Sequence, residues 1–196
     1  MDKEKYKTIT APAEGLYKEK GSKFMAFAYP VEHEGQIKTH IQALRKTYFD
    51  ARHHCYAYRL GTCGEVWRAN DDGEPSSTGG KPILGRLVSL DLTNTLVVVI
   101  RYFGGIQLGV PGLINAYRSA AADALENAQI IEKTAGEQFV FLFHYNNMHD
   151  IMRILKDEQI EILEQNFDME CRIKVSIVKS KIEMIVKKMT EAGARI

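Results

Sequence analysis

The segment TLVVVIRYFGGIQLGVPGLINAYRSAA, residues 95–121, runs from an apolar stretch through a turn with four glycines into an alanine-rich stretch. Residues 95–100 lack polar alternation, which is typical of a strand that is covered on both faces of its sheet. From Gly112 onward, apolar residues recur at helical spacing, which predicts a helix that is buried along one side. The segment therefore predicts a buried strand that leads through a glycine-rich turn into a packed helix.

Further strand and helix patterns precede this segment. β-Branched and aromatic residues on both sides of residues 20–21 predict an amino-terminal hairpin. Helical spacing begins at Glu34, and strand patterns then cover residues 51–60 and 65–70. Together with the segment above, these elements predict a first domain at residues 1–135.

A second unit is predicted after residue 135. Its pattern has the order strand, helix, strand, strand, helix, which is that of the split βαβ or ferredoxin-like motif. The expected elements are residues 138–145, 148–157, 160–167, 169–178 and 181–193, with only a trace of a final strand at 194–196. We therefore expect an α+β protein with two domains, residues 1–135 and 136–196.

The composition of the chain argues against several classes of protein. The formal net charge is +1, so a nucleic-acid site would have to be a local basic patch. No stretch approaches the roughly 20 apolar residues of a membrane span, and the first residues are too polar for a signal peptide. Three cysteines without a CxxC pair indicate neither a disulfide framework nor a zinc site. We therefore expect a cytoplasmic protein that does not bind membranes and has no metal or other cofactor.

The glycine-rich turn is the first candidate site. Its glycines allow positive φ or a close approach of the backbone, and the start of the following helix offers unpaired N–H groups. Such a helix start binds anions, and Arg101 would add a bidentate contact to phosphate. Alternatively, the glycines only form a tight turn, and Arg101 pairs with an internal carboxylate. The candidate ligand-binding residues here are Arg101, Tyr102, Phe103, Gly104, Gly105, Gly109 and Gly112.

The loop NDDGEPSSTGG, residues 70–80, is the second candidate site. Carboxylates and hydroxyls so close together could hold a cation or position a ribose or a water molecule, although their spacing is not that of an EF-hand. The same residue types favour turns and helix N-caps, so a structural role explains much of the loop. The candidate residues are Asp71, Asp72, Glu74, Ser76, Ser77 and Thr78.

The strand ARHHCYAYRL, residues 51–60, is the third candidate. Side chains alternate between the two faces of a strand, so one face is aromatic and basic. Residues of this kind stack on bases and contact phosphates, which predicts an RNA-binding surface. The candidate residues on this face are Arg52, His54, Tyr56 and Tyr58.

The opposite face of this strand carries His53 and Cys55. Two residues apart on one face, these side chains have the arrangement of a catalytic base and its nucleophile. Free cysteines are more often buried packing residues, however, and no third orienting group is evident.

The motifs described so far resemble, in their order and spacing, the Impact/YigZ family. They read DARHHCYAYRL at 50–60, NDDGEPSSTGGKPIL at 70–84, and LVVVIRYFGGIQLG at 96–109 followed by GLINAY at 112–117. The resemblance covers about residues 15–125, and residues 137–196 resemble the small C-terminal domain of bacterial members. It implies a ribosomal protein S5 domain 2-like fold for the first domain, and a second domain similar to one of elongation factor G.

The resemblance also implies a role in translation. Eukaryotic Impact proteins restrain the kinase that reports amino-acid starvation by competing for its activator, which implies translation regulation and a stress response. This sequence has no counterpart of their extra N-terminal domain, which limits the transfer of the kinase role. It also has Pro111 and Asn115 where relatives often have a glycine and a basic residue, which removes one cation from the anion site.

We therefore expect a translation-associated binding protein that is not an enzyme. Its partner would be RNA, the ribosome or a translation factor, and we expect no reading of DNA sequence. The alternative is a metal-dependent enzyme that acts on a phosphorylated or peptide-like small molecule. In that case Asp71, Asp72 or Glu74 would bind metal or act as base, assisted by His53 or His54.

Overall fold

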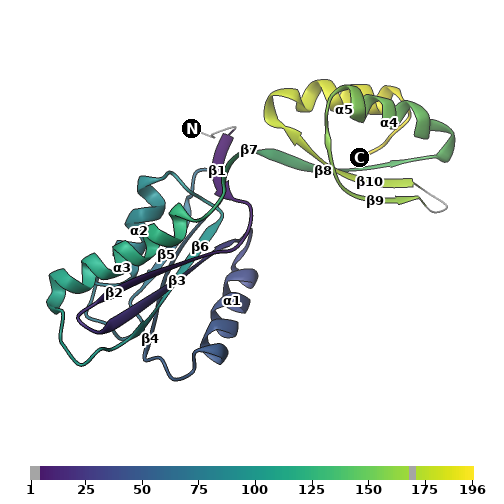
Figure 1. Cartoon of the computed structure of the whole chain (residues 1–196). Coiled ribbons are helices and arrows are strands. Elements are labelled where there is room, and N and C mark those ends of the chain that lie inside the picture. Colours follow the sequence, from purple (N-terminus) through teal and green to yellow (C-terminus); the bar gives the residue numbers. More distant parts are fainter. Residues whose placement is uncertain (1–4, 168–170) are drawn as a thin grey trace. The chain divides into compact units, whose positions relative to one another are not determined.

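The computed structural model describes residues 5–167 and 171–196, and the chain divides into two compact units between Lys133 and Thr134 (Figure 1). Each unit combines helices with an antiparallel main sheet, which confirms the expected mixed α+β class. In this part of the chain, no helix is both long and apolar enough to cross a membrane.

A five-stranded antiparallel sheet with the order β2-β3-β6-β4-β5 forms the centre of the first unit. Its strands are β2 Ala13–Glu19, β3 Ser22–Pro30, β4 His53–Leu60, β5 Val66–Asn70 and β6 Thr95–Tyr102. Strand β6 is central, and every side chain from Thr95 to Arg101 is buried. Two short strands, β1 Lys5–Ile9 and β7 Ile130–Thr134, form a separate sheet.

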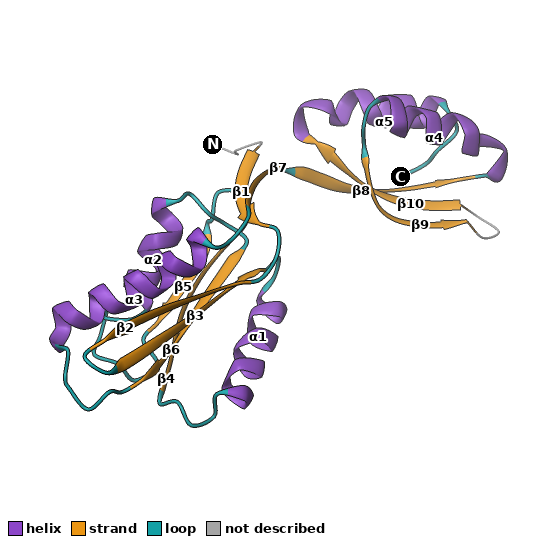
Figure 2. Cartoon of the chain, in the orientation of Figure 1, coloured by secondary structure: helices purple, strands orange, loops and turns teal. Residues whose placement is uncertain are grey.

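Helices cover both faces of the five-stranded sheet (Figure 2). Helix α1, Glu34–Thr47, packs on one face, where Ile37 and Leu44 join a core with side chains of β4 and β6. Helices α2, Gly80–Ser89, and α3, Gly109–Glu126, pack on the other face, where alanines of α3 contribute to a second core. Burial on both faces explains why the sequence of β6 shows no polar alternation.

The second unit has the expected order of elements. They are β8 Gly136–Phe143, α4 Met148–Asp157, β9 Glu161–Phe167, β10 Cys171–Val178 and α5 Ile182–Glu191. The sheet is antiparallel with the order β8-β10-β9, and Arg195 forms a single antiparallel bridge to Leu142 of β8. Residues 169 and 170, which begin the strand expected at 169–178, lie outside the described residues.

Candidate functional site

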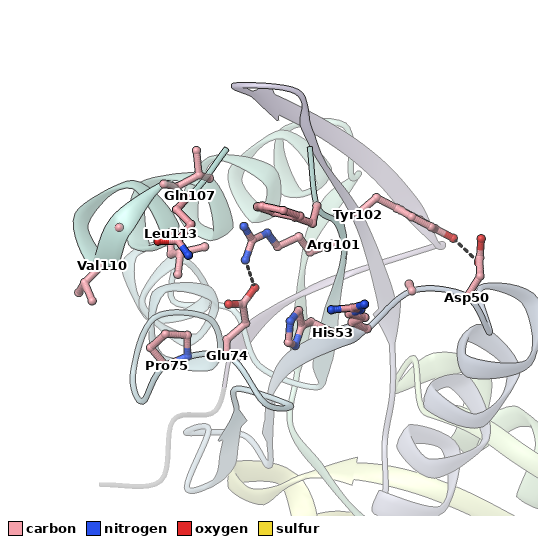
Figure 3. A pocket seen from close by; sticks show the side chains of 14 residues that line it. Asp50, His53, Glu74, Pro75, Arg101, Tyr102, Gln107, Val110 and Leu113 are labelled. Carbon is pink, nitrogen blue, oxygen red and sulfur yellow. Dashed lines mark hydrogen bonds and ion pairs between the residues drawn. The ribbon is translucent and has the colours of Figure 1, made fainter. Parts of the chain in front are cut away.

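A cleft of about 840 Å³ lies where the end of β6, the start of β4, the loop at 71–78 and the start of α3 meet (Figure 3). We call it the Arg101 cleft. Among its lining residues are Arg52, His53, Glu74, Arg101, Phe103 and Val110. The topology brings these residues together because β4 and β6 are neighbours in the sheet and pair His53 with Arg101.

The Arg101 side chain forms a buried ion pair with Glu74 in this cleft. Its Nη1 lies 2.6 Å from Glu74 Oε1, and the two side chains are 9% and 3% exposed. The hydroxyl of Tyr117 donates to the same Glu74 oxygen at 2.8 Å. Of the two interpretations of Arg101 from sequence, pairing with an internal carboxylate is the one observed.

Two aromatic rings flank the Arg101 guanidinium, which lies 5.5 Å from the ring centre of Phe24 and 5.6 Å from that of Phe103. Such cation–π contacts attract the guanidinium to both rings. Its Nε is buried and has no hydrogen-bond partner among the described residues. This nitrogen is therefore shielded from the cleft as well as unpaired.

Helix α3 begins at the cleft without a side-chain cap. Its N-cap residue Leu108 makes no capping hydrogen bond, and Pro111 in the first turn has no N–H to donate. Within the described residues, the first turn of α3 therefore receives no capping hydrogen bond from its N-cap residue. The positive end of the helix dipole lies at the same place, so this helix start suits an anion.

The glycine-rich turn is anchored on the amino-terminal hairpin. The Gly104 N–H donates to Ser22 Oγ at 3.1 Å, and a Cβ on Gly104 would overlap the backbone of Gly21 and Ser22. Only glycine permits this approach. The neighbouring Phe103 is 59% exposed, so it gives the cleft an apolar edge.

Tyr102 faces the other side of the cleft, where its hydroxyl donates to Asp50 Oδ1 at 2.7 Å. This hydrogen bond raises the pKa of Tyr102 to about 12. The phenol therefore stays neutral and ties the end of β6 to the loop before β4.

The carboxylates of the loop at 71–78 serve the fold. Asp71 Oδ1 accepts from the N–H groups of Gly79 and Gly80 at 2.9 and 2.8 Å, and its Oδ2 accepts from Ser77 at 2.8 Å. Asp72 accepts from the His54 N–H at 2.7 Å. In the described part of the chain, no three His, Cys, Asp or Glu residues are grouped as metal ligands.

The hydroxyl side chains of this loop do not line the Arg101 cleft. Ser76 is exposed, the Thr78 hydroxyl donates to the Pro75 carbonyl at 2.6 Å, and Ser77 lines a different groove. Turn and capping roles, which the sequence also indicated, account for the bonds that Asp71 and Thr78 make.

The aromatic face of β4 lies beneath α1. Tyr58 is 6% exposed and its hydroxyl donates to Glu34 Oε1 at 3.0 Å, while Tyr56 packs partly buried in the same core. His54 is also buried. His54 and Tyr58 therefore offer no open face to a base and Tyr56 is only partly exposed, whereas exposed Arg52 lines the cleft.

Cys55 is fully buried, and its Sγ donates to the Asp71 carbonyl at 2.9 Å. Burial raises the pKa of the Cys55 thiol, so the thiolate that a nucleophile requires is disfavoured. His53 Nδ1 lies 2.9 Å from the Asp72 carbonyl oxygen, which can only accept, so this nitrogen donates. The geometry therefore favours packing over nucleophilic catalysis for Cys55.

The sequence did not single out several residues that line the cleft. Gln107, Leu108 and Val110 belong to the glycine-rich turn and helix start, so their position between the glycines was an available signal. Asp50 carries no such signal, because only the folded sheet brings it to Tyr102.

Stability should fall as the pH drops below about 6.5, because of His54. Burial, followed by the charge of Arg45, lowers the pKa of His54 from its usual value of 6.5. The unfolded chain therefore binds a proton first, and stability that is complete above the unfolded-state pKa is lost as the pH falls toward the folded-state pKa.

Urea midpoints between about pH 7.5 and about pH 5 measure this decline. His54→Leu should reduce this decline, while the contribution of His40, whose pKa burial also lowers, remains in both proteins. An equal decline in wild type and variant would show that His54 is not the group responsible.

The comparisons with known proteins agree with the motifs. The sequence model of the Impact N-terminal domain matches residues 20–125. The IMPACT family member YvyE of Bacillus subtilis is 31% identical over 170 residues, which cover 87% of this chain and 78% of that protein. The crystal structure of "an hypothetical protein" is 25% identical, with a TM-score of 0.74 over 98% of this chain and 96% of the other.

The structure of the "two-domain translational regulator Yih1" is 26% identical over 62% of this chain and 47% of that chain. Its TM-score is 0.38, which is too low to show a common fold. The similarity to Yih1 is therefore one of sequence.

Proposed function

Because the chain belongs to the Impact family, we propose that it is a translation-associated binding protein whose Arg101 cleft receives an anionic group of its partner. Translation is the setting that the Impact resemblance implies, and Yih1 is described as a translational regulator. The proposed partner is the ribosome, whose RNA presents phosphates at high density. Such a role places the protein in the cytoplasm.

The observation that carries this proposal is the start of α3 beside an exposed arginine. Arg52 is exposed on the cleft wall and has no ion-pair partner in the described residues, whereas the charge of Arg101 is already paired with Glu74. Backbone N–H groups and a nearby guanidinium together form an anion site. Exposed Phe103 and Val110, at 59% and 52%, add an apolar edge for a base or an apolar side chain.

We also propose finer fold assignments for the two units. The second unit is ferredoxin-like, because its antiparallel order β8-β10-β9 gains Arg195 on the free side of β8, where the final strand of that motif lies. The first unit has the S5 domain 2-like fold, which rests on the Impact resemblance.

Val110→Glu tests the cleft directly. Val110 lies in the first turn of α3 and is half exposed, so a glutamate there is tolerated by the helix and places a carboxylate at the anion site. The matched control is Val110→Gln, which has almost the same shape without the charge. Co-sedimentation with ribosomes at low salt should be weakened about tenfold by Val110→Glu, the equivalent of one charge-assisted contact.

Arg52→Ala should weaken co-sedimentation in the same way, since Arg52 is an exposed cation of the cleft. Arg101→Ala is a poor probe, because it breaks the buried ion pair with Glu74.

Equal co-sedimentation of Val110→Glu and Val110→Gln would remove the cleft from the proposal. Wild-type protein that stays at the top of the gradient at low salt would remove the ribosome as partner.

A further inference from the structure

A second groove lies between α2 and α3 and shares no lining residue with the Arg101 cleft. We call it the α2–α3 groove. Its volume is about 370 Å³. The lining includes Ser77, Lys81, Gly85, Arg86, Ser89 and Arg118.

The α2–α3 groove is lined by basic side chains and, among the described residues, by no acidic ones. Its three cations, Lys81, Arg86 and Arg118, have no ion-pair partner among the described residues, and no carboxylate lines it. The Nε of Arg86 is buried without a hydrogen-bond partner in the same part of the chain. Three uncompensated cations at one hollow produce a local positive potential on a chain whose net charge is only +1.

The position of Gly85 supports a ligand site. Gly85 lies inside α2, where glycine is less favourable than alanine, and its backbone does not have the positive φ that would require glycine. A Cβ at Gly85 would meet no atom within 4 Å. Because Lys81, Gly85 and Ser89 are spaced four residues apart, they share one helix face, and the missing side chain leaves the middle of that face open.

We propose that the α2–α3 groove binds a phosphate group, carried either by a small phosphorylated molecule or by an RNA strand. Lysine and arginine donate charge-assisted hydrogen bonds to phosphate oxygens, and the hydroxyls of Ser77 and Ser89 add neutral donors. The open floor at Gly85 gives the phosphate room between the cations. This site is independent of the Arg101 cleft and would exist whether or not that cleft binds the ribosome.

The test uses pairs of variants that differ in charge and not in shape. Gly85→Glu and Gly85→Gln both place a side chain in the open space, and only the first adds a negative charge. Lys81→Gln removes a groove cation, while Lys38→Gln removes an exposed lysine from α1 on the other face of the sheet. One arm measures inorganic pyrophosphate by titration calorimetry, and the other measures a labelled oligouridylate by fluorescence anisotropy at several salt concentrations.

The Gly85→Glu variant should bind its phosphate probe about tenfold more weakly than Gly85→Gln does. This difference is the equivalent of one lost charge-assisted contact. With the oligouridylate, Lys81→Gln should lower the slope of log affinity against log salt by about one, and Lys38→Gln should leave it unchanged. If the Gly85 variants change the binding of pyrophosphate and not of the oligouridylate, the phosphate comes from a small molecule. If they change the binding of the oligouridylate and not of pyrophosphate, the phosphate comes from an RNA strand.

The proposal is overturned if neither probe binds wild-type protein, or if Gly85→Glu and Gly85→Gln bind equally. Lys38→Gln, which alters neither the Arg101 cleft nor the α2–α3 groove, should leave binding of pyrophosphate unchanged. Loss of pyrophosphate binding in Val110→Glu and not in Gly85→Glu would place the phosphate in the Arg101 cleft and overturn this proposal.

Discussion

Replacing Arg101 with methionine should lower the free energy of unfolding by about 3–5 kcal/mol, because it leaves the Glu74 carboxylate buried without its cation. The two side chains are 9% and 3% exposed, so the carboxylate is largely shielded from water. The Tyr117 hydroxyl remains as a donor to Glu74, but it carries no charge. Equilibrium unfolding in urea, with an unchanged m-value and a shifted midpoint, measures the loss.

The control for this prediction combines Arg101→Met with Glu74→Gln. Glutamine removes the unpaired charge and keeps an oxygen that can accept from Tyr117, so the double variant should recover at least about half of the lost stability. Equal instability of the single and double variants would mean that charge burial is not the cause. The loss of packing between Phe24 and Phe103 would then explain the effect.

The Arg101–Glu74 pair also shows where sequence reasoning stops. An arginine at the end of a buried strand is equally consistent with an anion site and with an internal ion pair. The choice depends on Glu74, which lies 27 residues earlier and reaches Arg101 only once the loop at 71–78 folds over the sheet. No local pattern contains that contact.

The course of the main chain was more predictable than the side-chain environment. The strand at 95–102 and the helix expected from Gly112 follow from an apolar run and from helical spacing, both of which are local signals, although the helix begins three residues earlier, at Gly109. The environment of Tyr58 could not be predicted in this way. Alternation along β4 assigns the Tyr58 side chain to one face of the sheet, but it does not indicate which element covers that face. Helix α1 covers it, and Glu34 binds its hydroxyl.

Replacing Asp71 with alanine should lower the free energy of unfolding by about 2–4 kcal/mol, because one carboxylate holds three backbone N–H groups. These groups belong to Ser77, Gly79 and Gly80, so the change releases both the loop and the start of α2. Asp71→Asn should cost less, since its remaining oxygen can still accept from Gly79 and Gly80. Urea unfolding of the two variants measures the difference.

Asp71→Ala also separates the structural role from a metal-dependent enzyme. If Asp71 served a metal, Mg²⁺ or Mn²⁺ would raise the melting temperature of wild type, and Asp71→Ala would abolish that rise. We expect no metal-dependent rise in either protein, because both Asp71 oxygens already accept backbone hydrogen bonds.

The Glu74 N–H donates to the Asp71 carbonyl at 2.9 Å within the turn that Asp71 organises. Asp71 therefore positions Glu74, and Glu74 in turn holds Arg101. A double-mutant cycle of Asp71→Ala and Arg101→Met should then give a combined loss smaller than the sum of the two, because a loosened loop no longer keeps Glu74 buried. Strict additivity would mean that the ion pair contributes equally with and without Asp71, so Asp71 would not position Glu74.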